Sequence, residues 1–299
     1  MAQITAALVK GLRDRTGAGM MDAKKALVES DGDMEAAVDW LRAKGLSKAA
    51  KKSGRTAADG LVAALVSDDG KSGALVELNA ETDFVARNEI FQKAVHEVAA
   101  IALETDGSLD AVSGAPAPDG EGTIADMITR LVATIGENMA LRRTSKLSAD
   151  SVASYIHGAE ADGMGKIGVL VGLNGGGDLA EAGRKVAMHV AATSPASATV
   201  ADLDQALVER ERQILTEQAE QSGKPANVIE KMIEGRLKKF YKEVVLVEQP
   251  FVMDPDKTVG KFISESGAEL VGFQIFKLGD GIEKEEDDFA AEVASLTNS

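Results

Sequence analysis

The sequence predicts an α+β fold in which a small helical bundle precedes a core made of two similar halves. Apolar residues recur at helical spacing over 4–15, 20–30 and 34–44, which predicts the bundle. From residue 60 onward the spacing changes to that of β-strands. A strand followed by a helix then occurs twice, over 73–103 and 168–192, which predicts an internal repeat.

The first domain is expected over residues 1–55. The turn 16–19 separates its first two helices, and Asp33 can cap the third helix. Gly45 is expected to end that helix. The basic residues that follow indicate a solvated linker: Lys48, Lys51, Lys52 and Arg55.

The core is expected in two subdomains, 56–140 and 141–279, each a small, mostly antiparallel sheet covered by helices. Within the second, residues 203–241 contain two charged amphipathic helices around a break at 222–225. This pattern predicts a projecting helical hairpin. A hairpin that packs on the body of the protein is the alternative.

The chain is expected to end in a strand and a helix. A final strand is predicted over 269–278. An acidic helix is predicted over 283–296, within a C-terminal helical module at 280–299. The fold therefore has helices at both ends of the core.

Composition limits the classes of function. The chain has 299 residues, of which 44% are hydrophobic, and this is ample for a buried core. The net charge of -15 repels phosphate backbones and acidic membrane surfaces, so direct binding of nucleic acid is not expected. With no cysteine and no apolar run near the length of a membrane span, we expect a cytoplasmic protein without disulfides or a membrane anchor.

The two copies of the repeat differ most where the strand meets the helix. The second copy has Gly175, Gly176, Gly177 and Asp178 there, and the first has Glu81, Thr82, Asp83, Phe84 and Val85. Because both copies solve the same packing problem, residues found in only one junction are not required by it. Turn tips are where binding residues concentrate, so Phe84 is the first candidate. The alternative is a core aromatic residue on the helical face of Phe91.

The sequence offers little enzyme chemistry. His96 and His189 occupy matching places in the two copies, which indicates a shared packing role. No two histidines have the spacing of a zinc-binding helix, and no serine lies in a nucleophile elbow. The strongest enzyme-like pattern, typical of a dinucleotide site, is formed by Gly175, Gly177 and Ala180. Asp178 argues against it, because its carboxylate would stand where the pyrophosphate should bind.

Long, unusual strings in the chain identify a family. They lie at residues 12–22, 24–27, 79–85, 135–138, 155–158, 167–171, 187–192, 222–225, 249–253 and 288–293. On these strings the chain resembles the bacterial elongation factor Ts family, the guanine-nucleotide exchange factors of the translational GTPase elongation factor Tu. The resemblance runs nearly end to end. One departure is the segment at 159–166, which follows His157 and is longer and richer in glycine than the family pattern.

The resemblance implies a set of partner contacts. In the family a Thr-Asp-Phe-Val segment reaches the magnesium site of the partner, and its Phe wedges between partner side chains. That segment corresponds here to Thr82, Asp83, Phe84 and Val85. Further partner-binding positions implied are Arg13, Met20, Met21, Lys24, Ile135, Gly136, His157, Val252 and Met253.

Some of these positions have structural alternatives. One of Met20 and Met21 is expected in the core of the bundle, although exposed methionines are adaptable contact residues. A lone strand histidine such as His157 is more often structural than functional. The resemblance also implies a bundle similar to ubiquitin-associated domains, a coiled coil in the hairpin, and a C-terminal module that binds the GTPase.

The expected function is that of a guanine-nucleotide exchange factor in translation elongation. It promotes GDP release by disturbing the Mg²⁺ and phosphate site of elongation factor Tu, with no covalent chemistry, cofactor or metal of its own. Dimerisation of the complex through the hairpin stays open. Two other classes stay open as well: a dehydrogenase-like enzyme that uses the Gly175 region, and a scaffold that binds through the hairpin without exchange activity.

Overall fold

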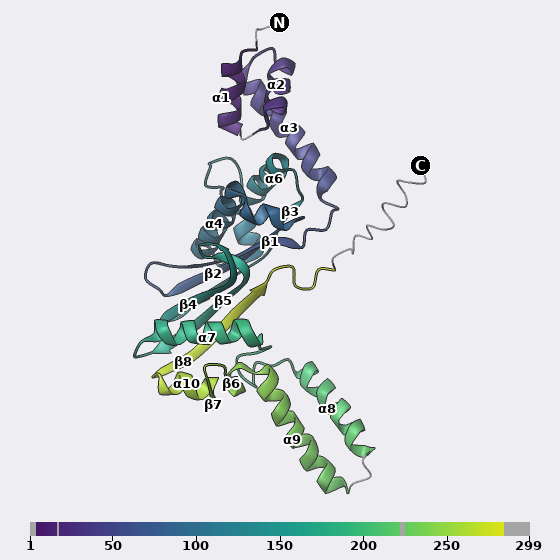
Figure 1. Cartoon of the computed structure of the whole chain (residues 1–299), viewed down its shortest axis with the longest axis vertical. Coiled ribbons are helices and arrows are strands. Elements are labelled where there is room, and N and C mark those ends of the chain that lie inside the picture. Colours follow the sequence, from purple (N-terminus) through teal and green to yellow (C-terminus); the bar gives the residue numbers. More distant parts are fainter. Residues whose placement is uncertain (1–3, 17, 222–224, 284–299) are drawn as a thin grey trace.

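The computed structural model describes residues 4–16, 18–221 and 225–283. The molecule is elongated, with a helical bundle at one end, a layered core in the middle and a pair of long helices at the other end (Figure 1). The mixed helix and strand content agrees with the predicted class. The predicted helix at 283–296 lies almost entirely outside the described residues.

The N-terminal bundle consists of α1 (Ala6–Thr16), α2 (Met20–Glu29) and α3 (Met34–Lys52). Its helices meet around a small apolar core of fully buried side chains: Leu12, Ala23, Ala26, Leu27 and Ala37. The carboxylate of Asp33 accepts the backbone N–H of Ala36, so the predicted cap of the third helix is confirmed.

Gly45 does not end α3, and the connector to the core begins later than predicted, after Lys52. The helix continues for two more turns to Lys52, and it packs on α6 (Ile124–Ile135). A Cβ atom on Gly45 would lie 3.0 Å from the Cβ of Ala133. Glycine is therefore present because the two helices approach closely. Of the basic residues after it, Lys48, Lys51 and Lys52 belong to α3, and Arg55 follows the helix and is exposed.

The core contains two three-stranded sheets of the same design, which are hydrogen-bonded to each other and so form one six-stranded sheet. In the first, β2 (Ser72–Ala80) lies between β1 (Asp59–Val66) and β3 (Met139–Ser148). In the second, β5 (Met164–Gly175) lies between β4 (Ser151–Ala161) and β8 (Ala268–Lys277). All of these pairs are antiparallel, as predicted. A short antiparallel pairing of β1 with β5 joins the two sheets.

The strand registers support the internal repeat. The pairing of β2 with β3 shifts between Glu77 and Leu78, and that of β5 with β8 shifts between Gly172 and Leu173. These irregularities fall at matching places of the two copies. The expected subdomain boundary after residue 140 cuts through β3, whose pairing with β2 places it in the first half.

The two sheets face each other between two outer layers of helix (Figure 1). α4 (Glu89–Glu104) covers the first sheet and α7 (Leu179–Thr193) covers the second. A Cβ atom on Gly73 would lie 2.8 Å from Val152 of the facing sheet. The buried residues between the sheets are Val62, Ala64, Leu75, Val152, Leu170 and Phe276.

A buried carboxylate fastens the two halves together. Glu77 on β2 has no exposed surface and forms ion pairs with Arg142 and Arg143 of β3. It also accepts the backbone N–H of Gly279, just after β8, at 2.8 Å. Arg143 in turn lies over the ring of Phe276, 4.4 Å from its centroid. The end of the second half is thereby tied to the central strand of the first.

The two histidines do not share a packing role, so that prediction is wrong. His96 is exposed, whereas His189 has no exposed surface. The buried pair Ala94–Val95 of α4 matches the buried pair Val186–Ala187 of α7, which shifts the alignment by one residue. Along the helix, His189 therefore corresponds to Glu97 and not to His96.

The helical hairpin projects from the core, as predicted (Figure 1). It consists of α8 (Gln205–Glu220) and α9 (Ala226–Val244). Buried Leu215, Ala219 and Leu237 line the side where the helices meet. Arg236 donates to the side-chain oxygen of Gln218 across the pair at 2.8 Å.

Four elements between the hairpin and β8 had no sequence prediction. The 3₁₀ turn η2 (Leu246–Glu248) leads into β6 (Pro250–Phe251), β7 (Asp254–Thr258) and α10 (Val259–Glu265). Two further helices complete the first half: α5 (Leu109–Gly114) and α6. The segment from β6 to α10 shares a hydrophobic cluster with α7 and packs beside β8, at the end of the core from which the hairpin projects.

Candidate functional site

The junction after β2 forms a short 3₁₀ turn, η1 (Asp83–Arg87). Asn88 interrupts the helix and caps α4 by accepting the backbone N–H groups of Ile90 and Phe91. This break removes Phe84 from the face that buries Phe91. Phe84 is 81% exposed while Phe91 has no exposed surface, so the core alternative is wrong and the expected exposure is confirmed.

Buried and bonded neighbours hold Phe84 outward. Val85, which follows it, is buried in the hydrophobic core between the first sheet and its covering helices. Thr82, two residues before it, donates from its backbone N–H and its Oγ1 to the two oxygens of Glu137, at 2.9 and 2.7 Å. The backbone N–H of Asn138 donates to Glu81 at 2.6 Å, and Arg55 pairs with the same carboxylate at 3.2 Å. The junction is therefore fixed on both sides of an aromatic ring that touches solvent.

The predicted residues Ile135 and Gly136 lie next to this junction, at the end of α6. Ile135 is half-buried and packs against the hydrophobic core between the first sheet and its covering helices. Gly136 caps the helix with a φ of 91°, a conformation that favours glycine. Lys52 of α3 donates to the carbonyl of Gly136. This helix end thus connects the bundle to the segment that holds Thr82.

The hairpin of β4 and β5 brings His157 to the same region. His157 is exposed, and its Nδ1 lies 3.3 Å from the hydroxyl of Tyr155. Beyond it, Glu160 pairs with Arg87 of η1 at 3.5 Å. The long segment at 159–166 is absorbed as a bulge and a tight turn at Gly163, whose φ is 66°. It leaves the strand that carries His157 paired with β5.

On the bundle, the predicted contact residues lie on its outer surface. Met20 is 59% exposed and Met21 76% exposed, so the expectation that one of them belongs to the core is wrong. Arg13 and Lys24 are exposed as well. Two adjacent exposed methionines form an adaptable apolar contact surface.

Val252 and Met253 form the turn between β6 and β7, and they are 47% and 44% exposed. Phe251, just before them, is buried and stacks on Phe262 with ring centroids 4.4 Å apart. The backbone N–H of Val252 donates to Nδ1 of His189 at 3.2 Å. The turn is therefore held by an aromatic contact just before it and by a backbone hydrogen bond within it.

The predicted residues therefore form three groups and not one site. The junction group contains η1, the end of α6 and the hairpin of His157, which are joined by the hydrogen bond of Thr82 with Glu137 and the ion pair of Arg87 with Glu160. The bundle lies at one end of the molecule and the β6–β7 turn near the other (Figure 1). A partner that touches all three groups must extend along the long axis.

The structure around the glycine pattern does not have the arrangement of a dinucleotide site. The strands paired with β5 are antiparallel to it, whereas a dinucleotide site lies between parallel strands. The carboxylate of Asp178 accepts the backbone N–H of Glu181 and so caps α7 itself. A Cβ atom on Gly175 would lie 2.6 Å from the carbonyl oxygen of Gly267, so these glycines serve close backbone packing.

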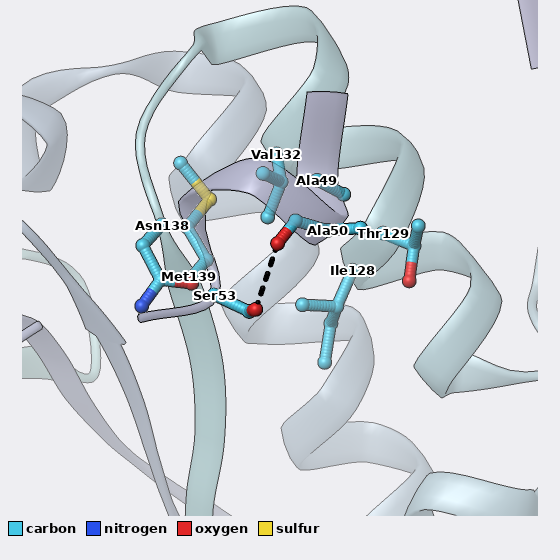
Figure 2. Close-up of a pocket in the computed structure, with 8 residues that line it drawn as sticks. All are labelled: Ala49, Ala50, Ser53, Ile128, Thr129, Val132, Asn138 and Met139. Atoms are coloured by element: carbon cyan, nitrogen blue, oxygen red, sulfur yellow. Dashed lines mark hydrogen bonds between the residues drawn. The ribbon is translucent and has the colours of Figure 1, made fainter. Parts of the chain in front are cut away.

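Other signs of a chemical site are lacking in the part of the chain that the structure describes. No cluster of three His, Asp or Glu side chains could hold a metal ion there. The pocket in Figure 2 lies between the end of α3, α6 and the start of β3, and no acid or base lines it. Its lining residues are Ala49, Ala50, Ser53, Ile128, Thr129, Val132, Asn138 and Met139. Within residues 4–16, 18–221 and 225–283, no helix has the length and apolar character to cross a membrane.

For several residues that shape these surfaces, the sequence did not predict the contacts that they make. Glu137 and Asn138 lie in one of the strings that carry the family resemblance, but spacing alone does not show that they bind the junction. His189 and Gln249 likewise show their connection to the β6–β7 turn only in three dimensions. Each of these contacts joins residues more than fifty positions apart.

Comparison with known proteins assigns the family. A family model described as Elongation factor TS matches residues 81–280. A curated elongation factor Ts of Hyphomonas neptunium is 69% identical over 298 residues, with 99% of each chain covered. The chain belongs to the elongation factor Ts family. The curated elongation factor Ts of Gluconobacter oxydans is 58% identical over 304 residues, with 100% of each chain covered, and that of Dinoroseobacter shibae is 59% identical over 295 residues.

Membership of the elongation factor Ts family gives the chain its general role. It is a nucleotide exchange factor of translation elongation, and its partner is elongation factor Tu. An exchange factor acts by binding and not by covalent chemistry. An exposed, firmly held aromatic ring suits that role, because the ring is free to be buried by another protein.

Proposed function

We propose that this chain accelerates GDP release from elongation factor Tu by inserting η1 beside the Mg²⁺ and phosphate site of the partner. The exposure of Phe84 is the observation that carries the proposal. Thr82, Asp83 and Val85 form the rest of the inserted segment, in which Val85 anchors the turn and Asp83 lies exposed beside the ring.

The energetics of insertion depend on burial of the Phe84 ring. Burying an aromatic side chain that was exposed contributes about 2 to 3 kcal/mol. This contribution helps to offset the distortion of a site in which Mg²⁺ compensates the charge of the nucleotide phosphates. Since coupling free energies are reciprocal, the chain and GDP must weaken each other's binding to the partner.

The way the junction is held supports insertion without large rearrangement. The two hydrogen bonds from Thr82 to Glu137 and the ion pair of Arg87 with Glu160 restrict η1 before binding. A segment that is already ordered loses less conformational entropy when it binds. Ile135, Gly136 and His157, which surround the junction, are proposed as neighbouring contacts.

The other two groups of exposed residues are proposed to fix the orientation of the partner. Arg13, Met20, Met21 and Lys24 would dock the bundle on the GTPase domain, and Val252 with Met253 would touch a second part of the partner. Contacts at both ends of an elongated molecule would leave η1 with one way to approach the nucleotide site.

The finer features of the architecture belong to the proposal as well. The bundle is proposed to be UBA-like, and the hairpin of α8 and α9 to form a coiled coil through which the complex can dimerise. The C-terminal module at 280–299 is proposed to bind the GTPase. Since translation elongation takes place in the cytoplasm, this is the proposed location.

The proposal is tested by measuring release of labelled GDP from elongation factor Tu with and without the chain, over a range of Mg²⁺ concentrations. The chain should accelerate release strongly when Mg²⁺ is abundant and much less when Mg²⁺ has been removed with EDTA, because the step it promotes is then already complete. Equal acceleration under both conditions would contradict the magnesium mechanism. Binding to the partner that is indifferent to GDP, with no acceleration, would support the scaffold instead.

A further inference from the structure

His189 is a buried polar residue that lies directly behind the β6–β7 turn. It belongs to α7, has no exposed surface, and its ring centroid lies 5.7 Å from that of Phe251. Its Nε2 lies 2.8 Å from Oε1 of Gln249, and its Nδ1 lies 3.2 Å from the backbone nitrogen of Val252. Both ring nitrogens are thus engaged by the segment that enters the turn.

These partners fix the tautomer of the ring. The backbone N–H of Val252 can only donate, so Nδ1 accepts. Nε2 therefore carries the proton and donates to Gln249, whose oxygen also accepts the hydroxyl of Thr193 at 3.0 Å. The amide nitrogen of Gln249 donates to the carbonyl of Glu243 at 2.8 Å. The network joins α7, the end of α9 and the β6–β7 turn.

Packing alone does not account for a histidine at this position. An apolar side chain would fill the space without the cost of burying two polar nitrogens. The matching position of α4 is Glu97, which is half-buried and pairs with Lys93 on its own helix. The polar network therefore occurs in the second copy and not in the first. Only in the second copy does the helix, α7, lie next to a turn that exposes two apolar side chains, Val252 and Met253.

We propose that His189 is a positioning residue for partner binding, which holds the backbone of Val252 so that Val252 and Met253 face outward. The inference rests on the proposed function, since it assumes that these two side chains touch elongation factor Tu. Without the bond to Nδ1, the N–H of Val252 has no acceptor on the buried side and the turn is free to change its conformation.

Two isosteric substitutions separate the two nitrogens of the ring. In His189→Asn the side-chain oxygen takes the place of Nδ1 and can accept from Val252, but the contact with Gln249 is lost. In His189→Gln the amide nitrogen takes the place of Nε2 and can donate to Gln249, but the acceptor for Val252 is lost. Each variant removes one hydrogen bond, so both should lower the melting temperature to a similar extent.

The affinity for nucleotide-free elongation factor Tu is expected to differ between the variants. His189→Gln should weaken binding about tenfold, whereas His189→Asn should stay within about threefold of the wild type, as the loss or retention of one buried hydrogen bond implies. Amide hydrogen exchange at Val252 in the free chain should be faster in His189→Gln only. Equal affinities, or losses that follow the melting temperatures of the two variants, would overturn the positioning role.

A second measurement distinguishes failure of this inference from failure of the proposed function. Val252→Ala and Met253→Ala remove the exposed side chains and leave the backbone bond to His189 in place. If they bind as the wild type does while Val252 exchange still depends on the His189 variant, the ring holds the turn but the turn is no contact surface. That result overturns the binding role at this turn and leaves the action of Phe84 untouched.

Discussion

The two strand-to-helix junctions occupy the same place in the repeat, but one packs closely within the chain and the other exposes an aromatic side chain. After β5 the chain turns through glycines that press against the backbone of Gly267, and Asp178 caps the next helix. After β2 the chain forms η1, and Phe84 points away from the core with 81% of its surface exposed. The comparison separates what the fold requires at this position from what has been added to it.

A second difference lies within the central strands themselves. Glu77 of β2 corresponds to Gly172 of β5, at the irregularity that both sheets share. Glu77 binds two arginines and the backbone beyond β8, so it stabilises the core. Phe84, by contrast, forms no hydrogen bond or ion pair through its side chain with any residue that the structure describes, and 81% of its surface is exposed. The first copy thus has one added residue that serves stability and one that is available for binding.

The largest effect is expected from Glu77→Ala. Removing the carboxylate leaves Arg142 and Arg143 without their buried partner, which should lower the free energy of unfolding by about 3 to 5 kcal/mol. Chemical denaturation measures this loss. Glu181→Ala, which breaks an exposed ion pair of the second copy, is the control and should change stability by less than about 0.5 kcal/mol. Similar losses for both variants would show that Glu77 does not join the two halves.

Phe84→Ala should separate function from stability. The thermal midpoint of the free chain should stay near that of the wild type, because the ring makes little contact with the core. GDP release stimulated by the chain should slow by at least about tenfold, as the loss of a buried ring in the complex implies. Gly176→Ala in the other junction is the control. Its new Cβ atom would have no neighbouring atom within 4 Å, so neither the thermal midpoint nor stimulated GDP release should change.

Val271→Ala provides a second control for Phe84→Ala. Val271 is 45% exposed on β8, outside the three groups of contact residues. Its replacement should leave stimulated GDP release unchanged. A large loss of melting temperature in Phe84→Ala, with unchanged release, would contradict the contrast between the two junctions.

A smaller effect is expected from Glu137→Ala, which removes both acceptors of Thr82. The ring stays present but the junction is less ordered, so stimulated GDP release should slow by about threefold to tenfold. Glu121→Ala, at an exposed acid elsewhere in the first half, is the matched control. Full activity of Glu137→Ala would show that the order of the junction before binding does not matter.

The smallest effect is expected in the pH dependence of the melting temperature, through His189 in the second copy. Burial lowers the pKa of His189 below its ordinary value of 6.5, because the charged ring cannot be solvated there. The unfolded chain then binds more protons than the folded chain as pH falls below about 6.5, so the stabilisation is complete above that pH and is lost toward acid. The melting temperature of the wild type should fall more than that of His189→Asn between pH 7 and pH 5.5. Parallel curves would show that His189 does not titrate differently on folding.

The sequence predicted the features that repeat. Strand periodicity and the matched strings around Leu75 and Leu170 correctly indicated two antiparallel sheets with their covering helices. The same comparison identified the exposure of Phe84, because a residue unique to one copy had no packing role to explain it. Repetition is informative because it separates common packing from local additions.

The errors arose where one residue has two physical explanations. Gly45 can end a helix or admit a neighbouring helix, and only the approach of Ala133 decides between them. His96 and His189 match in sequence, but the buried faces of the two helices differ by one residue. The anchors Glu137 and Gln249 could not be predicted from spacing, since their partners lie far away in the chain.

The central claim, that elongation factor Tu buries the side chain at position 84, is tested most directly by placing a fluorophore there. In Trp40→Phe/Phe84→Trp the new indole is the only one in the chain, because the native sequence has one tryptophan. The account predicts emission typical of exposed tryptophan in the free chain, and a blue shift with loss of acrylamide quenching on adding nucleotide-free elongation factor Tu. Unchanged emission and quenching in a complex that demonstrably forms would contradict it.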